Sequence, residues 1–476
     1  MRIGVDARLL ARPLTGIGRY THEMVNALLR TGADLTLYAP GPLVHPLHEG
    51  AGRVRQRIVP LKGGAGRFLW GQAVLPVLVR RDRPEIFWGP AHRLPLGLPR
   101  DIFGCLTVHD LVWRFAGETM RPASRLMERL LMPPALKRAD AVVAVSRHTG
   151  ADIARSFPDL RAGISVIYPG IAARPPGHRA GYLEKWGIAR PYILFVGTLE
   201  PRKNLARLLR AYAALPDGIR EQAHLVVAGG AGWGDVDLEK AIAALALRGH
   251  VHLTGYVDER ELSTLYENAL LLAMPSLYEG FGLPLAEAMQ YGLPMLTANI
   301  SSMPEVAGEA ALLVDPLDAG AIADGLRRLV GSPDLRARLA EAALAGARRF
   351  DWDRAARQLL DLFARQGREG QRRAPCLSGD RPGVRQGIRS INGRFPDGPR
   401  RHPVARSVAA IVPRNPVQYS MSGKRMQRRR WTTGRRRRAF ASAMRASRPS
   451  IRTLPPSATR WREPDAPCSI ATRRAA

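Results

Sequence analysis

The chain has 476 residues, enough for two or three domains of ordinary size, each with its own hydrophobic core. Its three cysteines, Cys105, Cys376 and Cys468, are an odd number at no metal-ligand spacing, so neither a disulfide framework nor a thiolate metal site is indicated. The net charge of +31 is high enough for a nucleic-acid binder, but the excess is unevenly distributed.

Charge divides the chain into three regions. Residues 1–180 hold 26 Lys and Arg against 13 Asp and Glu, residues 181–366 hold 19 against 23, and residues 367–476 hold 27 against 5. Three charge characters predict three structural units. The start, "MRIGVDARLL", is charged too soon for a secretory signal, and no apolar run approaches the roughly 20 residues that span a bilayer. We therefore expect a cytoplasmic protein, either soluble or peripheral on the inner face of the plasma membrane.

Strand-length apolar runs alternate with helical patterns from residue 1 to about residue 366. Runs that mostly end in Gly, Ser, Asp or Pro predict strands at 2–7, 34–39, 102–110, 141–146, 192–198, 224–230, 251–257 and 270–276. Apolar residues at helical spacing predict helices between them, among them 204–215 and a long helical stretch at 321–350. This alternation predicts an α/β fold in which β-α units wind into parallel sheets.

The segment from Tyr168 to Ile188 interrupts this rhythm with prolines and glycines, and the charge character changes across it. We interpret it as an interdomain linker. The predicted units are a Rossmann-like N-terminal domain at 1–175, a Rossmann-like C-terminal domain at 176–366 and an arginine-rich tail of low order at 367–476. Because doubly wound sheets bind ligands beyond the carboxyl ends of their strands, we expect a ligand cleft between the two domains.

Residues 367–476 contain 26 arginines and one lysine, with scattered prolines and no periodic apolar pattern. Too little apolar surface is arranged to form a core, so we expect disorder. One hypothesis is that this tail binds RNA or anionic lipid, since Trp431 among arginines can stack on a base. The alternative is an unconstrained extension, because a shifted reading frame in a GC-rich gene would itself encode Arg, Pro, Gly and Ala.

Glycines and polar residues follow two predicted strands of the first half. Gly16 and Gly18 open the helix after the first strand, which favours anion binding, although a G-x-G triplet alone is a weak nucleotide-binding signal. His109 and Asp110 end a later strand, at the edge where parallel sheets bind ligands. A single histidine is more often structural than catalytic, so His109 gains weight only in combination with other residues.

Two cations follow the first strand of the second half. That strand ends at Gly197, and a short turn brings Arg202 and Lys203 before a helix that Asn204 could cap. Such a pair can neutralise a diphosphate without a metal. The alternative is a pair of solvated turn residues, which is the more frequent case for cations taken alone.

The stretch "SLYEGFGLPLAEAMQYG" puts Glu279 and Glu287 on either side of a glycine-rich bend. Pro284 suits the first turn of a helix and Gly292 suits its C-terminal cap, which predicts a helix at about 283–291. The bend then lies against a helix N-terminus, where free backbone N–H groups attract anions. Glu287 can hydrogen-bond a neighbouring diol, and Glu279 stands at the mouth of the site.

Two Asp-x-Asp triplets, at 235–237 and 351–353, have the form of ligands for a metal bound to a diphosphate. Both lie where helices are predicted to begin, and helix N-termini favour Asp for capping. We therefore predict no metal site and no cofactor. A serine hydrolase is not supported either, because the chain has no G-x-S-x-G motif.

Together these motifs resemble a known enzyme family. Residues 1 to about 366 are similar to retaining glycosyltransferases of the GT-B fold, family 4 (glycosyl transferases group 1), and within it to the mannosyltransferase-like branch that builds bacterial O-antigen and other surface polysaccharides. The similarity is carried by "RIGVDARLLARPLTGIGRYT", "TVHDLVWRF", "ILFVGTLEPRKNLARLL" and "PSLYEGFGLPLAEAMQYGLPMLTANISSMPEVAGEAALLVDP". It implies two Rossmann-like domains that face a cleft, and a terminal helix around 352–363 that crosses back to the first domain.

The resemblance implies a role for each candidate residue. Arg202 and Lys203 would bind the diphosphate and stabilise the leaving group, and Glu279 would contact the donor sugar. Glu287 would hold the ribose hydroxyls, and His109 would position or polarise hydroxyls of the sugar. The other implied nucleotide-sugar contacts are Gly16, Gly18, Tyr256, Val257, Gly280, Phe281, Gly282 and Leu283.

The implied reaction moves a hexose from a nucleotide diphosphate sugar to an acceptor hydroxyl, with the anomeric configuration kept and without a metal. GDP-mannose is the expected donor, and a lipid-linked saccharide is the expected acceptor. Thr198 departs from the family pattern, because many relatives have an arginine there; Arg202 and Lys203, with Arg19 as a candidate helper, must then carry the diphosphate charge. Segment 121–138 mixes apolar and basic residues, so it could rest on an anionic membrane surface or form a core helix.

Two alternatives stay open. The first is another GT-B enzyme, such as an epimerase or a synthase of a soluble disaccharide, which would act without a lipid acceptor. The second is an arginine-rich nucleic-acid binder with a degenerate enzyme domain, which would bind RNA in a salt-sensitive way. The intact set of Glu279, Glu287, Arg202 and Lys203 argues against degeneracy.

Overall fold

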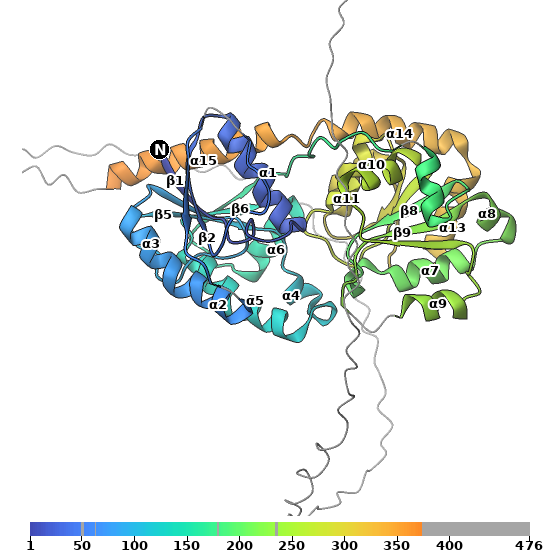
Figure 1. Cartoon of the computed structure of the whole chain (residues 1–476), viewed down its shortest axis with the longest axis horizontal. Coiled ribbons are helices and arrows are strands. Elements are labelled where there is room, and N and C mark those ends of the chain that lie inside the picture. The colour runs from blue at the N-terminus through green and yellow to red at the C-terminus, as the bar shows by residue number, and fades with distance from the viewer. Residues whose placement is uncertain (49–51, 62, 179, 234–236, 374–476) are drawn as a thin grey trace, which may run out of the picture. The chain divides into compact units, whose positions relative to one another are not determined.

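The first domain is built on a seven-stranded parallel sheet in the order β3-β2-β1-β4-β5-β6-β7 (Figure 1). The computed structural model describes residues 1–373 apart from 49–51, 62, 179 and 234–236. The order of the strands reverses between β1 and β4, as it does in doubly wound folds. The strands are β1 (Arg2–Asp6), β2 (Asp34–Ala39), β3 (Val54–Ile58), β4 (Ile86–Gly89), β5 (Phe103–Val108), β6 (Ala141–Ala144) and β7 (Gly163–Val166).

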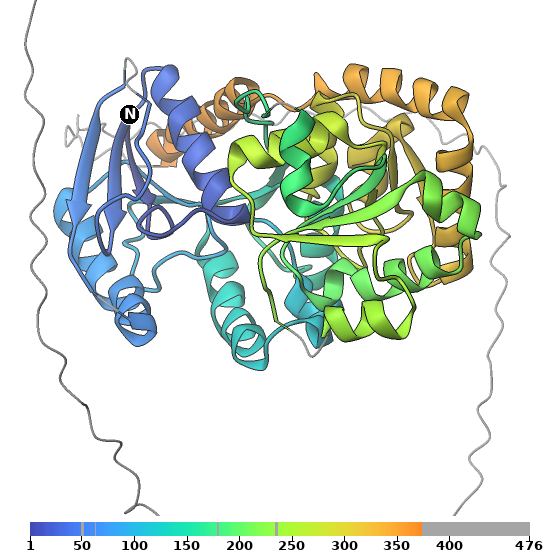
Figure 2. The same ribbon diagram turned by 45° about the vertical axis from the view of Figure 1, so that its right-hand side comes forward.

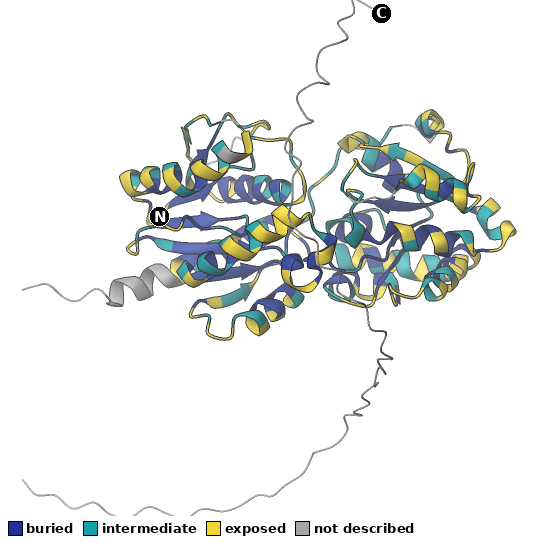
Figure 3. Ribbon diagram, turned by 90° about the horizontal axis from the view of Figure 1, so that it is seen from below, coloured by how far each residue is buried: buried dark blue, intermediate teal, exposed yellow. Residues whose placement is uncertain are grey.

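Alternation along the strands gives this sheet two apolar faces, and helices cover both. In β6, Ala141 and Val143 pack in one hydrophobic core, whereas Val142 and Ala144 pack in another, because successive side chains of a strand point to opposite faces. Seen from below, the strands are buried and the outer helix faces are exposed (Figure 3). The helices are α1 (Gly16–Arg30), α2 (Gly63–Leu69), α3 (Leu75–Asp82), α4 (Val112–Phe115), α5 (Pro122–Arg138) and α6 (Arg147–Ser156), with a π-helical turn at Trp70–Val74 and a 3-10 turn at Gly117–Thr119.

The second domain has a six-stranded parallel sheet in the order β10-β9-β8-β11-β12-β13. Its order reverses between β8 and β11. The strands are β8 (Tyr192–Val196), β9 (His224–Ala228), β10 (Val251–Gly255), β11 (Leu271–Met274), β12 (Met295–Ala298) and β13 (Ala311–Val314). The helices are α7 (Leu205–Ala213), α8 (Asp217–Gln222), α9 (Leu238–Ala244), α10 (Glu259–Asn268), α11 (Leu283–Gln290), α12 (Met303–Ala307), α13 (Ala319–Gly331), α14 (Pro333–Ala347) and α15 (Trp352–Arg373), with 3-10 turns at Ala180–Trp186, Pro201–Lys203 and Gly308–Ala310.

The terminal helix α15 crosses back and packs against α1 of the first domain, as the resemblance implied (Figure 1). Trp352 and Phe363 are buried in the same core as Met24 of α1. Arg30 at the end of α1 forms an ion pair with Asp353, 2.6 Å between Nη2 and Oδ1. The two segments join although 323 residues separate this pair along the chain.

All eight predicted strands are present, and β3, β4, β7, β12 and β13 were not predicted. Four of these five have only four residues, and the fifth, β3, is an arginine-bearing edge strand with little apolar pattern. The predicted helical stretch at 321–350 is two helices, because Ser332 caps α14 through the N–H of Leu335 and Pro333 occupies its first turn.

The interval between the two sheets, from Val166 to Tyr192, contains the predicted domain boundary at residue 175. Helix α15 continues to Arg373, past the predicted start of the tail at residue 367. The predictions of disorder and of RNA or lipid binding concern residues 367–476, of which 374–476 lie outside the described residues. In the described part of the chain, no helix is both long enough and apolar enough to cross a membrane.

Candidate active site

A cavity of about 530 Å³ is lined by segments that follow β1, β5, β8, β9, β10 and β11, at the carboxyl ends of strands from both sheets. This is where ligands of doubly wound sheets bind. Residues far apart in the chain meet there, and most of the predicted site residues are among them: Gly16, His109, Arg202, Lys203, Tyr256, Val257, Glu279, Gly280, Phe281, Gly282, Leu283 and Glu287.

Gly18 is not among the residues that line this cavity. Helix α1 begins at Gly16 as predicted, and a Cβ at Gly16 would meet nothing within 4 Å. Gly18 is buried in the first turn, where a Cβ would lie 3.5 Å from Leu14. Successive residues of a helix are rotated by about 100° about its axis, so Gly18 faces another side of α1 than Gly16. That side faces Leu14 in the loop before the helix.

Glu279 holds both predicted cations of the site. Arg202 Nη1 lies 2.7 Å from Glu279 Oε2, and Lys203 Nζ lies 2.6 Å from Oε1. Glu200 binds the other side of the guanidinium, 2.9 Å from Arg202 Nε. Burial would raise the pKa of Glu279, but the charges of Arg202 and Lys203 outweigh it and lower the pKa to about 2. The carboxylate is therefore ionised at neutral pH, and two cations balance two anions in this cluster.

Asn204 does not cap α7 with its side chain, so that prediction is wrong. Its backbone is left-handed, with φ at 61°. Its Oδ1 accepts from Arg207 Nη1 at 2.6 Å, and its Nδ2 donates to Pro275 O at 2.9 Å and Pro316 O at 2.7 Å. The amide thus ties the turn after β8 to the end of β11, and it fixes the turn that presents the two cations.

Glu287 is held by three residues, one of them in the predicted linker. Arg174 Nη2 lies 2.5 Å from Oε1, and the hydroxyl of Tyr266 donates to Oε2 at 3.0 Å. Arg19 of α1 is 3.7 Å from Oε1 and also pairs with Glu259 at 3.3 Å. The Arg174 side chain is only 4% exposed. Local sequence pattern did not reveal this contact, because a lone arginine in a Pro/Gly segment has no local partner.

His109 is a buried neutral imidazole. Its Nε2 lies 2.7 Å from Pro90 O, so this nitrogen carries the proton and Nδ1 is the acceptor. Its backbone N–H donates to His92 Nε2 at 2.9 Å, and Tyr20 packs edge-on against the ring with centroids 4.6 Å apart. Burial and the neighbouring His92 lower the pKa of His109 to about 3. His109 can therefore accept a hydrogen bond from a ligand hydroxyl, and His92 is a supporting residue that the sequence did not reveal.

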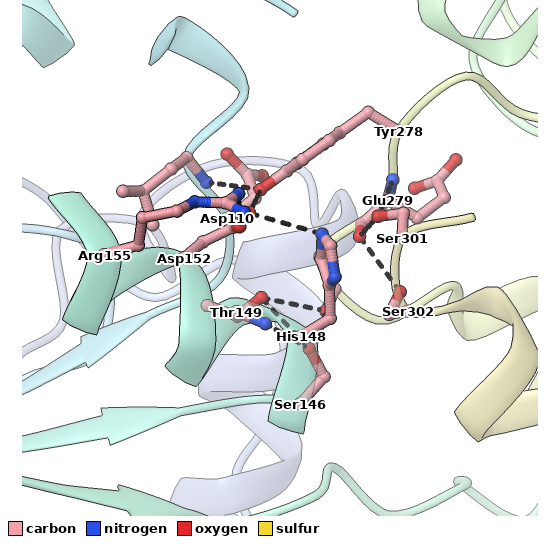
Figure 4. Close-up of polar contacts among 12 residues, drawn as sticks. Asp110, Ser146, His148, Thr149, Asp152, Arg155, Tyr278, Glu279, Ser301 and Ser302 are labelled. Atoms are coloured by element: carbon pink, nitrogen blue, oxygen red, sulfur yellow. Dashed lines mark hydrogen bonds and ion pairs between the residues drawn. The ribbon is translucent and has the colours of Figure 1, made fainter. Parts of the chain in front are cut away.

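The loop between β11 and α11 contacts the first domain through polar side chains (Figure 4). The hydroxyl of Tyr278 donates to Asp152 Oδ2 at 2.6 Å, and the carbonyl of Gly280 accepts from Ser146 Oγ at 2.6 Å and from Thr149 Oγ1 at 3.1 Å. The following helix α11 begins at Leu283, with Pro284 in its first turn as predicted. One face of this loop therefore lines the cavity, while the carbonyl of Gly280 is bound by the neighbouring domain.

Tyr256 follows β10 at the mouth of the cavity and is 81% exposed. Val257 lies beside it and is partly buried against the core. A large aromatic ring left this exposed beside a cavity offers a flat apolar surface to a ligand.

Of the three aspartates of the Asp-x-Asp triplets that the structure describes, two act as helix caps. Asp237 accepts from the N–H of Lys240 at the start of α9, and Asp351 accepts from the N–H of Arg354 at the start of α15. Asp353 pairs with Arg30 instead. Asp235 lies outside the described residues. Over residues 1–373 apart from the stated gaps, no group of three His, Cys, Asp or Glu side chains is arranged to hold a metal ion.

Two family models match the chain. The model described as "Glycosyltransferase Family 4" matches residues 14–174, and "Glycosyl transferases group 1" matches residues 183–345. The O-antigen chain mannosyltransferase B of Escherichia coli is 31% identical over 387 residues, which cover 76% of this chain and 99% of that protein.

Solved structures resemble the fold at lower identity. The sucrose-phosphate synthase of Thermosynechococcus elongatus matches with a TM-score of 0.62 and 20% identity, over 77% of this chain and 99% of that one. The Anabaena protein HepE, solved in complex with UDP-glucose, matches with a TM-score of 0.59 and 18% identity, over 77% of this chain and 100% of that one.

Proposed function

Since the chain belongs to the family 4 glycosyltransferases, enzymes with the GT-B fold, we propose that it transfers mannose from GDP-mannose to a lipid-linked or growing polysaccharide acceptor with retention of configuration. The observation that carries this proposal is the convergence of Glu279, Arg202, Lys203 and Glu287 on one cavity between two parallel sheets. The similarity to an O-antigen chain mannosyltransferase supports the choice of sugar and acceptor.

In this proposal Arg202 and Lys203 bind the diphosphate. Both line the cavity and follow the carboxyl end of β8, and Glu279 and Glu200 hold their side chains in place. The acceptor hydroxyl attacks the anomeric carbon as the bond from that carbon to the diphosphate oxygen breaks, and the hydroxyl proton passes to the departing phosphate. The two cations stabilise the charge that grows on the diphosphate, so the step requires neither a metal nor a protein nucleophile.

Glu287 and Arg174 form the proposed ribose site. A ribose diol can donate hydrogen bonds to Glu287, whose carboxylate accepts through two oxygens and retains lone pairs beyond those used by Arg174 and Tyr266. Tyr256 offers its exposed ring to the base at the cavity mouth. His109, neutral with Nδ1 as its acceptor, positions a hydroxyl of the sugar.

An anionic membrane surface is the proposed location of the lipid-linked acceptor. Only Met132, Ala135 and Leu136 of α5 are buried, while Leu126 and Leu130 are 55% and 58% exposed. Helix α2 also leaves its Phe68 and Leu69 exposed, and both helices lie on the lower side of the first domain in Figures 1 and 2. Apolar side chains among the exposed basic residues Arg125, Arg129 and Lys137 favour a membrane surface over the core-helix interpretation.

The alternative within the same fold is transfer to a soluble acceptor, and the structural similarity to a sucrose-phosphate synthase keeps it open. Transfer to a lipid-linked saccharide in detergent, without transfer to free sugars or sugar phosphates, separates the two. The nucleic-acid hypothesis rests on the tail and is tested by RNA binding at increasing salt.

The test of the site is calorimetric titration of the full-length chain, in the presence of a chelator, with GDP-mannose, UDP-glucose and the free nucleoside diphosphates. We expect micromolar binding of one nucleotide class, weakened at least tenfold by Glu287→Gln. Glutamine is the matched replacement because it keeps the shape of the side chain beside Arg174. The wild-type chain and the variant carry the same basic tail, so the tail does not account for a difference between them. A folded wild-type chain that binds none of these nucleotides would overturn the proposed function.

A further inference from the structure

Three successive carbonyls of the loop between β11 and α11 are bound by side-chain hydroxyls. Glu279 O accepts from Ser301 Oγ at 2.6 Å and from Ser302 Oγ at 2.9 Å, and Phe281 O accepts from Ser302 Oγ at 3.0 Å. These donors belong to the second domain, like the loop itself. The carbonyl between them, that of Gly280, is bound only by donors of the first domain among the described residues.

The first-domain donors are Ser146 and Thr149, at the N-terminus of α6. Ser146 caps this helix by accepting from the N–H of Thr149 at 3.0 Å, which leaves its own hydrogen for Gly280 O at 2.6 Å. Thr149 Oγ1 lies 3.1 Å from both Gly280 O and His109 O. Ser146 therefore donates to Gly280 O, and the Thr149 hydroxyl, equidistant from the two carbonyls, shares its hydrogen between Gly280 O and His109 O.

The approach is close enough to require glycine in the loop. A Cβ on Gly280 would lie 1.8 Å from His109 O, a distance at which backbone would have to move.

Two further groups hold α6 in this place. Glu305 of α12 accepts from the N–H groups of Arg147 at 3.1 Å and His148 at 2.9 Å, in the first turn of α6. Tyr278 reaches Asp152 on its next turn (Figure 4).

We propose that Ser146 and Thr149 are positioning residues for the transfer reaction, because by holding the carbonyl of Gly280 they turn the N–H of Phe281 toward the cavity. The C=O and N–H of a trans peptide point in opposite directions, and Gly280 and Phe281 both line the cavity. This N–H then donates to an oxygen of the sugar nucleotide. The inference rests on the proposed function, and it adds that the first domain completes the donor site of the second.

A kinetic signature follows from where the two hydroxyls lie. They belong to the first domain, so they orient the Phe281 N–H only while α6 contacts the loop. The nucleotide is held mainly by the second domain's Arg202, Lys203 and Glu287, whether or not this contact is made. Loss of the hydroxyls should therefore lower kcat, through an N–H that stabilises the leaving group, and change nucleotide affinity little.

The test uses the full-length chain, with GDP for the affinity and the sugar nucleotide that the binding panel selects, GDP-mannose in our proposal, for turnover. We expect Thr149→Val and Ser146→Ala each to lower kcat about tenfold, with the Kd for GDP changed less than about threefold. Thr149→Ser keeps the hydroxyl and should recover most of the rate. Thr119→Val is the control, since Thr119 is also a buried first-domain threonine that donates to a carbonyl, Ala116 O, at 2.6 Å.

Ser146→Ala also removes the helix cap of α6, so Thr149→Val decides the case. An unchanged kcat for Thr149→Val in a wild-type background that transfers sugar would overturn this inference and leave the proposed function intact. A kcat for Thr149→Ser as low as that for Thr149→Val, or an equal loss for Thr119→Val, would also overturn it, because the effect would then be structural. A wild-type chain that binds no nucleotide would overturn both proposals.

Discussion

At the scale of single residues, the charges of the site are paired before any ligand arrives. Arg202 and Lys203 face Glu279, and Glu200 binds the remaining side of the guanidinium. A diphosphate must therefore compete with these carboxylates or gain from additional donors. Backbone N–H groups of the loop after β11 are such donors, and they bring no counter-charge with them.

The pair of Arg174 and Glu287 predicts how substitution affects stability. Their side chains are 4% and 11% exposed, so Glu287→Ala leaves a buried guanidinium without its carboxylate. We expect it to destabilise the protein by about 3 to 5 kcal/mol, and the double variant Arg174→Met/Glu287→Met to be less destabilised than Glu287→Ala alone. Thermal unfolding midpoints check this, with Glu287→Gln as the conservative variant. A double variant that is destabilised as much as Glu287→Ala, or more, would contradict a coupled pair.

The structure brings most of the predicted site residues to one cavity, and the sequence could reveal these residues because their chemistry lies in local spacing. The bend and helix from Glu279 to Glu287 and the cations after β8 required only a few neighbouring residues. Arg174 and Ser146 were missed for the opposite reason: their partners lie 113 and 134 residues away in the chain. No local pattern carries such a contact, and only the fold brings it about.

At the scale of elements, β9 and β10 are joined by a histidine pair as well as by backbone. His252 Nδ1 lies 3.2 Å from Trp186 O and carries the proton, so its Nε2 accepts from His224 Nδ1 at 3.0 Å. The ring planes differ by 22° with centroids 5.2 Å apart, so the rings meet edge to edge. One proton between the two nitrogens makes the bond, and a second proton abolishes it.

This pair predicts a loss of stability in mild acid. Burial lowers the pKa of both His224 and His252, with the neighbouring histidines adding to the effect. The unfolded chain, with histidine pKa values of about 6.5, then binds protons before the folded chain does. Stability is full above that pH and falls as the pH drops below it. We expect His252→Gln, which keeps an acceptor for His224, to flatten the decline of the thermal midpoint between pH 7.5 and pH 5. The contribution of His109 to this decline is the same in the wild type and in the variant. Parallel curves of thermal midpoint against pH would therefore refute the pair's role.

The elements themselves divide into those that a local pattern reveals and those that it does not. Apolar runs such as β8 and Leu225–Ala228 of β9 were predicted because a buried parallel strand reads as a continuous apolar run. Strand β12 has only four residues, and Thr297 interrupts its apolar side chains, so no apolar run of strand length marks it. The break between α13 and α14 depends on one Ser-Pro pair inside an otherwise continuous helical pattern.

At the scale of the whole molecule, α15 gives the first domain a part of its core from the far end of the described chain. Trp352, Leu359 and Phe363 are buried in the core that contains Met24 and the inner face of the first sheet. The stability of α1 should therefore depend on residues that follow the second domain in sequence. The pattern of apolar residues in α15 indicated an amphipathic helix but not the partner that it covers.

The helix α15 predicts a long-range effect of a single truncation. Phe363 is fully buried, so Phe363→Ala removes its contacts and leaves a cavity, at a cost of about 3 to 5 kcal/mol. Because α15 packs against α1, we expect amide hydrogen exchange to accelerate in α1 as well as in α15, while α13 of the second domain keeps its protection. Leu344→Ala, at an α14 position that is 53% exposed, should change stability by less than about 0.5 kcal/mol. If exchange accelerated in α15 alone, the helix would be a dispensable cover, and the first domain would hold its own core without it.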